Sequence, residues 1–303
     1  MRTILNLCTA LAVFSLVVAV AGCGDSGDEP GVVVTATTTQ LADLARNVAG
    51  ERAEVDGLLS TSSDPHDYEP RPSDAEALID ADLILKSGGD VDAWLDQLVE
   101  SAGSDAPELV LLDRVDQLEA DGEVDPHWWQ DPRNAVLAVD AIRDDLIAVD
   151  PDGRAQYERN AAAYVAEIER LDRGIAACIE RVPESERKLV TSHDSLGYFA
   201  NRYGIEVIGT AIPALTTQAQ ASAGETAELV DLIRDEDVTS VYPEAGVSSE
   251  LEEAIAEEAG ATVGEELWAD TLGPEGSGGE TYLGALASNA EAMVDGFGGE
   301  CEL

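Results

Sequence analysis

The sequence predicts an α/β protein with parallel sheets in two halves of the chain and one long helix lying along both. Short apolar runs alternate with amphipathic stretches on both sides of residues 151–181, which is typical of parallel α/β sheets. The segment 151–181 itself carries helical spacing and no strand signal. A chain of 303 residues with 45% hydrophobic residues is long enough to form two such halves.

In the first half, short apolar runs predict strands, and capped amphipathic stretches between them predict helices. The first helix begins at a threonine cap and ends at Gly50. The expected strands are 32–37, 54–59, 82–86 and 108–112, and the expected helices are 38–50, 73–81 and 90–100.

The long helix is predicted from one continuous apolar stripe with alternating steps of four and three residues. Its members are Tyr157, Ala161, Tyr164, Ile168, Leu171, Ile175 and Cys178. A helix from 151 to 178 would be roughly 40 Å long at 1.5 Å per residue. A lone coiled-coil arm is the alternative, but the stripe lasts for few heptads, and we expect the helix to lie along both halves.

The second half repeats the alternation. The expected strands are 187–192, 205–210, 238–243 and 261–265, and the expected helices are near 222–235, 249–259 and 280–295. The glycine-rich segment 273–279 lacks a preceding strand and a Lys-Ser/Thr ending, so it predicts a flexible loop and not a phosphate site.

The net charge excludes polyanionic partners. The chain has 62 acidic and 17 basic residues, a net charge of −45, and such a surface repels nucleic acid and anionic lipid. Two interpretations stay open: carboxylates that keep the surface solvated, for example in salt, or an electrostatic funnel for cations.

The N-terminus predicts export. Arg2 precedes an apolar run that ends in "VAGC", which resembles the bacterial lipobox with Cys23 as the lipidated residue. A plain transmembrane anchor is the alternative. We expect a signal peptide at 1–22, a lipidated tether at 23–30, and a protein anchored by lipid to the outer face of the cytoplasmic membrane or facing the periplasm.

Export also governs the cysteines. Cys8 would leave with the signal peptide and Cys23 would carry lipid, which leaves Cys178 and Cys301. We expect these two to form a disulfide in an oxidising compartment. Two free thiols are the alternative, and neither residue lies in a close-spaced metal-ligand motif.

The chain has three histidines, and each follows a predicted strand. His66 and His127 lie in near-copies of one motif, "SDPHDYEP" and "DPHWWQDP", and His193 follows the strand at 187–192. Ligand-binding loops gather at the carboxyl ends of parallel strands. We therefore expect the three imidazoles to meet in a metal site, the alternative being separate, hydrogen-bonded polar residues.

Residues beside the histidines suggest how the rings are held. Four aspartates could accept the second ring N–H, although Asp-Pro is also ordinary turn chemistry. These aspartates are Asp64, Asp67, Asp125 and Asp131. Trp128 and Trp129 are expected to pack between the two halves.

Four segments of the chain resemble those of a known family. The segments "DPHDYEP", "DPHWWQDP", "TSHDSLGYFANRYG" and "WADTLG…GGETYLGALASNAEAM" are similar, in order, to the ligand-bearing segments of zinc- and manganese-type substrate-binding lipoproteins of ABC transporters. The likeness runs from about residue 31 to the C-terminus. It implies two α/β lobes, at 31–150 and 183–303, joined by a rigid helix at 151–182, with the metal in the cleft between the lobes.

The resemblance also implies the site. His66, His127, His193 and Asp270 match the family's metal ligands, and Glu244 matches a glutamate near the cleft that we expect to support the site without binding the metal. The chain has no histidine-rich loop. The acidic stretch 116–125 stands in its place, which argues against a metal-loading role for that loop.

The expected function is capture of a divalent metal for an ABC permease by a monomer. Three imidazoles and one carboxylate favour Zn2+ over Mn2+, and manganese-type relatives tend to carry a carboxylate where this chain has His193. A zinc hydrolase is one alternative, but no HExxH occurs and Asp270 would close the coordination shell. An adhesin is the other alternative.

Overall fold

The computed structural model describes residues 31–120 and 122–303. The expected signal peptide, the lipidated Cys23 and the tether lie outside the described residues. Residues 31–303 form one compact unit. Among the described helices, none combines the length and the apolar character that a membrane crossing needs.

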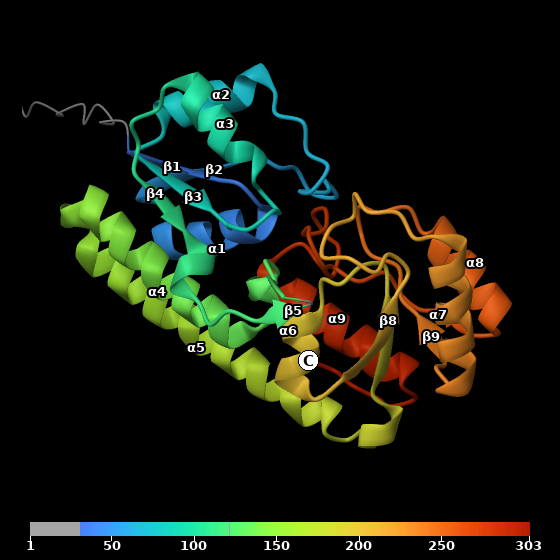
Figure 1. Cartoon of the computed structure of the whole chain (residues 1–303). Coiled ribbons are helices and arrows are strands. Elements are labelled where there is room, and N and C mark those ends of the chain that lie inside the picture. Colours follow the sequence, from blue (N-terminus) through green and yellow to red (C-terminus); the bar gives the residue numbers. More distant parts are fainter. Residues whose placement is uncertain (1–30, 121) are drawn as a thin grey trace, which may run out of the picture. The chain divides into compact units, whose positions relative to one another are not determined.

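The first lobe is built on a four-stranded parallel sheet in the order β2-β1-β3-β4. Its strands are β1 (Val32–Ala36), β2 (Ala53–Gly57), β3 (Leu83–Lys86) and β4 (Glu108–Val110). Its helices are α1 (Thr39–Ala49), α2 (Pro72–Asp80) and α3 (Trp94–Ala102). Figure 1 shows α1 on one face of the sheet and α2 and α3 on the other.

Alternation along β3 explains the two layers of this lobe. Leu83 and Leu85 belong to the large core that includes α1, whereas Ile84 points the other way and packs with Leu78 and Leu95. Successive side chains of a strand face opposite sides of the sheet, and all three strand residues are buried. A strand covered on both faces therefore reads as a continuous apolar run.

The second lobe repeats the strand order of the first. Strand β7 (Lys188–Thr191) pairs in parallel with β8 (Glu206–Thr210), and β9 (Ser240–Val241) pairs in parallel with β10 (Thr262–Val263). A parallel bridge between Thr191 and Tyr242 joins the two pairs. The resulting order β8-β7-β9-β10 is that of β2-β1-β3-β4. The helices of this lobe are α6 (Gly197–Tyr203), α7 (Ala223–Asp235), α8 (Glu250–Ala259) and α9 (Tyr282–Gly296).

The long helix is α5 (Arg154–Ile179), and it contacts both lobes. It packs against α1 and α4 on one side of the site and against α6 and α9 on the other. The predicted stripe is buried along it except for Leu171, which is only partly buried. The expected α/β fold with parallel sheets and one long helix is therefore confirmed.

Several elements were not among those predicted. The largest is α4 (Pro132–Val149), which packs antiparallel to α5, as Figure 1 shows. Asp131 caps it by accepting from the Arg133 N–H at 2.9 Å, and Pro132 occupies the first turn, a standard helix start. The others are α6, the antiparallel pair β5 (Glu119–Ala120) and β6 (Glu123–Val124), and the 3-10 turns η1 (Leu111–Arg114), η2 (Trp128–Gln130), η3 (Pro151–Gly153) and η4 (Glu184–Glu186).

A disulfide ties the C-terminal tail to α5. Cys178 lies in the last turn of this helix, and Cys301 follows α9. The two residues are 123 positions apart in sequence. Closing so long a loop restricts the unfolded chain more than the folded one, by about 4–5 kcal/mol in the chain-entropy model.

We expect Cys301→Ser to lower the melting temperature of the metal-free protein by roughly 10 °C, because the unfolded chain regains its loop entropy. Scanning calorimetry measures this. Reduction of the wild type should give the same decrease, and reduction of the variant should cause no further loss. Two free thiols titrated in the unfolded, unreduced mature protein would contradict the expectation.

Candidate metal centre

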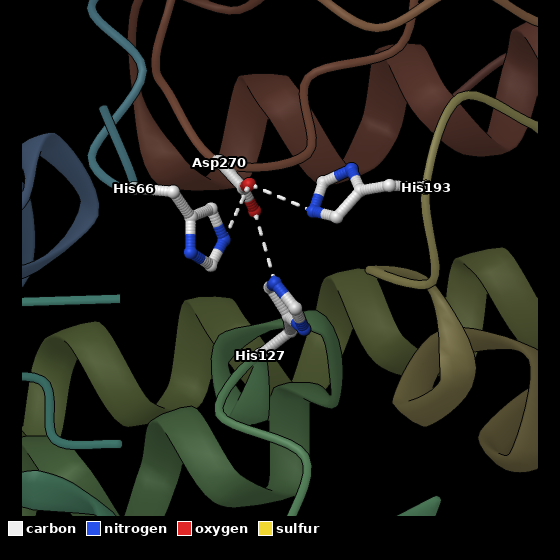
Figure 2. A group of neighbouring side chains, drawn as sticks. All are labelled: His66, His127, His193 and Asp270. Atoms are coloured by element: carbon white, nitrogen blue, oxygen red, sulfur yellow. Dashed lines mark ion pairs between the residues drawn. The ribbon is translucent and has the colours of Figure 1, made fainter. Parts of the chain in front are cut away.

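Three histidines and one aspartate converge on one point (Figure 2). From Asp270 oxygens, the Nε2 atoms lie at 3.4 Å for His66, 3.6 Å for His127 and 3.1 Å for His193. One ligand atom from each of the four residues can be chosen so that all lie within 4.8 Å of one another. All four residues are buried. The structure thus brings together the three histidines and the aspartate that the sequence indicated.

Parallel-sheet topology brings these four side chains together. His66 follows β2, and His127 lies in the long connection after β4, past η1 and the β5–β6 pair, whereas His193 follows β7 and Asp270 follows β10. Each therefore lies beyond the carboxyl end of a strand, two from each sheet. Loops at this edge are where parallel α/β sheets place their ligands.

His127 is held by its own loop. Asp125 Oδ1 accepts from the His127 backbone N–H at 2.9 Å and lies 2.7 Å from the ring Nδ1. The Trp129 ring meets the imidazole edge-on, with centroids 5.4 Å apart. A carboxylate on Nδ1 fixes the tautomer that leaves the Nε2 lone pair free. His127 therefore presents Nε2 to Asp270.

His193 is held by a carboxylate from the loop that follows the neighbouring strand β9. Glu244 Oε2 lies 2.8 Å from the His193 Nδ1. The other oxygen, Oε1, accepts from the His193 backbone N–H at 3.0 Å and from the Thr191 hydroxyl at 2.6 Å. Glu244 is buried and contacts the ring nitrogen opposite the one that faces Asp270. Its place is that of a supporting residue.

The His66 loop is held mainly through its backbone. Asp64 Oδ1 accepts from the His66 N–H at 2.9 Å, and the Gln218 side-chain amide donates to the His66 carbonyl at 2.6 Å. Thr217 donates to the second Asp64 oxygen at 2.6 Å. Gln218 and Thr217 belong to the second lobe, so this loop bridges the two lobes.

Of the four aspartates expected to accept a ring N–H, only Asp125 contacts an imidazole. Asp64 closes the backbone turn at His66, Asp131 caps α4 and pairs with Arg133, and Asp67 is exposed. Asp64 and Asp131 thus follow the turn-chemistry alternative, because a short Asp side chain reaches nearby backbone N–H groups more easily than a ring.

The Asp270 segment is attached to the first lobe by side chains that the sequence did not indicate. The Ala269 carbonyl accepts from the Trp129 indole at 2.8 Å, the Gln130 amide at 2.8 Å and the Gln40 amide at 3.2 Å. Gln40 is 229 positions from Ala269, and nothing in the sequence pairs them. Trp129, expected to pack between the halves, also donates a hydrogen bond across them.

Electrostatic interactions strongly link His127, His193 and Asp270. Burial alone lowers the pKa of His193, but the Glu244 and Asp270 carboxylates raise that pKa well above its ordinary value. Burial likewise lowers the pKa of His127, and Asp270 and Asp125 raise it overall. Burial raises the pKa of Asp270, yet His193 and His127 hold it well below its usual range. The metal-free cluster is therefore a set of mutually compensating charges.

The inward-facing atoms have no hydrogen-bond partner within the part of the chain that the structure describes. This holds for Nε2 of all three histidines and for both oxygens of Asp270. Buried polar atoms without partners are costly. Three imidazole nitrogens and a carboxylate suit a borderline divalent transition metal, which would satisfy all of them at once.

The chain is similar in sequence and in fold to known proteins. Residues 34–296 match the family model ZnuA, described as zinc-uptake complex component A periplasmic. The chain is 33% identical over 300 residues to the manganese-binding lipoprotein MntA of Halalkalibacterium halodurans, covering 96% of this chain and 99% of the relative. It is 30% identical over 270 residues to the iron-binding protein YfeA of Yersinia pestis, covering 88% and 86%. The fold is similar to the periplasmic zinc binding protein TroA of Treponema pallidum, with a TM-score of 0.83 and 26% identity over 88% and 99% of the two chains.

Removing the indole donor of Trp129 should loosen the Asp270 segment. We expect Trp129→Phe to lower the free energy of unfolding by about 1–2 kcal/mol and to speed hydrogen exchange at residues 269–272 in metal-free protein. Trp128→Phe is the matched control, because that indole donates to Ser87 within the first lobe. Equal exchange at 269–272 in the two variants would contradict a role for the Trp129 bond.

Proposed function

Because the chain belongs to the ZnuA family of metal-binding components of ABC importers, we propose that it captures a divalent transition metal outside the cytoplasmic membrane and delivers it to an ABC permease. The observation that carries the proposal is the buried set of three imidazole nitrogens and Asp270 oxygens without hydrogen-bond partners. Such a donor set binds a cation strongly and can release it only when the site opens.

The protein belongs to a family of solute-binding proteins and is not an enzyme. The hydrolase alternative would need an open coordination position with a general base beside it. Asp125 and Glu244, the carboxylates nearest the ligands, each contact a histidine Nδ1, so both are engaged in orienting rings.

The proposed location is the outer face of the cytoplasmic membrane. Cys23 would carry the lipid, and the polar residues after it would tether the two lobes, 31–150 and 183–303, with the helix at 151–182 between them. The relative MntA is named a lipoprotein, which supports this arrangement. A monomer with one metal site is the simplest form for handing a cation to the permease.

Zinc is the proposed ion. A given set of nitrogen and oxygen donors binds Zn2+ more tightly than Mn2+, which stands at the weak end of the divalent series, and three imidazoles suit zinc in particular. Manganese is the second candidate, because a relative that matches over 96% of the chain is named manganese-binding. Geometry and metal supply, as well as affinity, determine which ion a cell loads.

We expect metal-free wild-type protein to bind one zinc ion and His193→Ala to bind it at least roughly 100-fold more weakly, since even residues that only support a ligand contribute 10- to 100-fold. Titration with zinc against a chromophoric chelator measures this. Asp105→Asn is the control, because Asp105 is exposed and lies before β4, at the amino-terminal ends of the strands and away from the ligand loops. Full zinc occupancy in His193→Ala would remove His193 from the ligand set.

The same titration distinguishes the two ions. Wild-type protein loaded with manganese should lose it to equimolar zinc. Retention of manganese would favour the second candidate and would leave the capture of a divalent metal standing.

Zinc binding should weaken in acid, because histidine binds metal only when neutral. The neighbouring carboxylates raise the pKa of His127 and His193 in metal-free protein, so both rings take up protons above the ordinary pKa of about 6.5. As the pH is lowered, zinc affinity should therefore begin to fall before pH 6.5 is reached. Below pH 6.5 it should fall by several-fold per pH unit. Calorimetry in buffers from pH 8 to 5 tests this, and a flat profile would contradict a histidine-rich site.

A further inference from the structure

The three imidazoles of the metal centre are supported unequally. Nδ1 lies 2.7 Å from a buried carboxylate oxygen in His127 and 2.8 Å from one in His193. Nδ1 of both His193 and His66 lacks a well-aligned hydrogen bond among the described residues, but the His193 nitrogen has its carboxylate at 2.8 Å, whereas the His66 nitrogen, in a side chain only 1% exposed, has one at 3.8 Å. A histidine that binds metal through Nε2 carries a proton on Nδ1 and almost always donates it. The acceptor for His66 is therefore the missing part of the site.

Asp90 is the carboxylate that faces this nitrogen. Its Oδ2 lies 3.8 Å from the His66 Nδ1, and its side chain is 51% exposed. The separation is too long for a hydrogen bond and shorter than the roughly 4.5 Å that a bridging water spans at ordinary bond lengths and angles. Asp90 and His66 therefore face each other directly, without a hydrogen bond at this distance.

The backbone around Asp90 is shaped to place it there. Gly88 and Gly89 have positive φ angles of 99° and 75°, and a Cβ on Gly89 would meet the Pro126 side chain at 2.7 Å. The buried Asp92 carboxylate accepts from the Gly88 N–H at 3.0 Å and holds the turn. Only glycine tolerates this combination of φ and close approach. The turn thus brings Asp90 beside the ligand loop.

The exposed partner is the one with freedom to move. The His66 backbone is held at its N–H by Asp64 and at its carbonyl by Gln218, and its ring is buried. The Asp90 side chain instead lines a cavity of about 430 Å3 that it shares with Glu123 and residues 213–216 of the second lobe. Rotation of the Asp90 side chain is enough to change its distance from the ring.

We propose that Asp90 is a positioning residue that accepts the His66 Nδ1–H when a metal occupies the centre. Because this carboxylate is exposed while the other two are buried, its bond is the last support to form on loading and the first to break on release. Asp90 therefore governs the rate at which the metal leaves. This inference rests on the proposed function, since it requires a metal on His66.

The test uses the mature full-length protein in detergent with zinc as the only ligand. Zinc-loaded wild type should show three slowly exchanging imidazole Nδ1–H resonances by 15N NMR. Asp90→Ala should show two and should release zinc to excess chelator about tenfold faster in stopped flow, with an association rate within twofold of wild type. Asp90→Asn keeps an acceptor oxygen, so it should retain the third resonance and release zinc at an intermediate rate.

Glu123→Gln is the matched control, because it removes a charge from the same cavity and should leave all three resonances and the release rate unchanged. Equal acceleration in Glu123→Gln and Asp90→Ala would overturn the inference in favour of general charge. Three resonances and a wild-type release rate in Asp90→Ala would overturn it alone, with the proposed function intact. Failure of the wild type to bind either zinc or manganese would overturn the proposed function, and the inference with it.

Discussion

The rest of the structure depends on one constraint: three imidazoles and a carboxylate must face one another away from water. Removing such groups from water costs several kcal/mol each unless they are paired. Asp125 and Glu244 offset this cost by pairing with Nδ1 of His127 and of His193, on the side of each ring that faces away from Asp270. On the inner side, Nε2 of the histidines and the Asp270 oxygens lie at ion-pair distance from one another but form no hydrogen bond with any described group. A bound cation would serve as the common partner of these nitrogen and oxygen atoms, so the arrangement of the site suits a metal-bound state.

The architecture satisfies this constraint by repeating one sheet. The matching orders β2-β1-β3-β4 and β8-β7-β9-β10 supply carboxyl-end loops from both lobes, and α5 contacts both. The Ala269 carbonyl, with its three donors from the first lobe, then attaches Asp270 to the side of His66 and His127. His193 is carried with Glu244 on the second sheet. Movement of that sheet would therefore displace one ligand and its supporting carboxylate together.

The sequence predicted most of what depends on local pattern, helix α4 excepted, and did not predict the long-range contacts. The histidine loops follow apolar runs, and the stripe from Tyr157 to Cys178 has helical period, so both were visible. Helix α4 was missed although Asp131-Pro132 is a standard start, because the same residues were interpreted as part of a ligand loop. The bond from Gln40 to Ala269 has no sequence signature, since it depends on how two distant loops meet.

Surface charge and the metal centre have separate physical roles. The carboxylates that touch the ligand rings most closely are Asp125, Glu244 and Asp270, and all three are buried. With 62 acidic and 17 basic residues, most other carboxylates cannot be paired with a basic residue. At a Debye length of about 8 Å in physiological salt, unpaired surface charges act over short range, so they influence how often cations arrive and not which cation stays. Asp90 differs from these three because it is exposed and faces a ligand ring, so at this position a surface charge can act directly on the site.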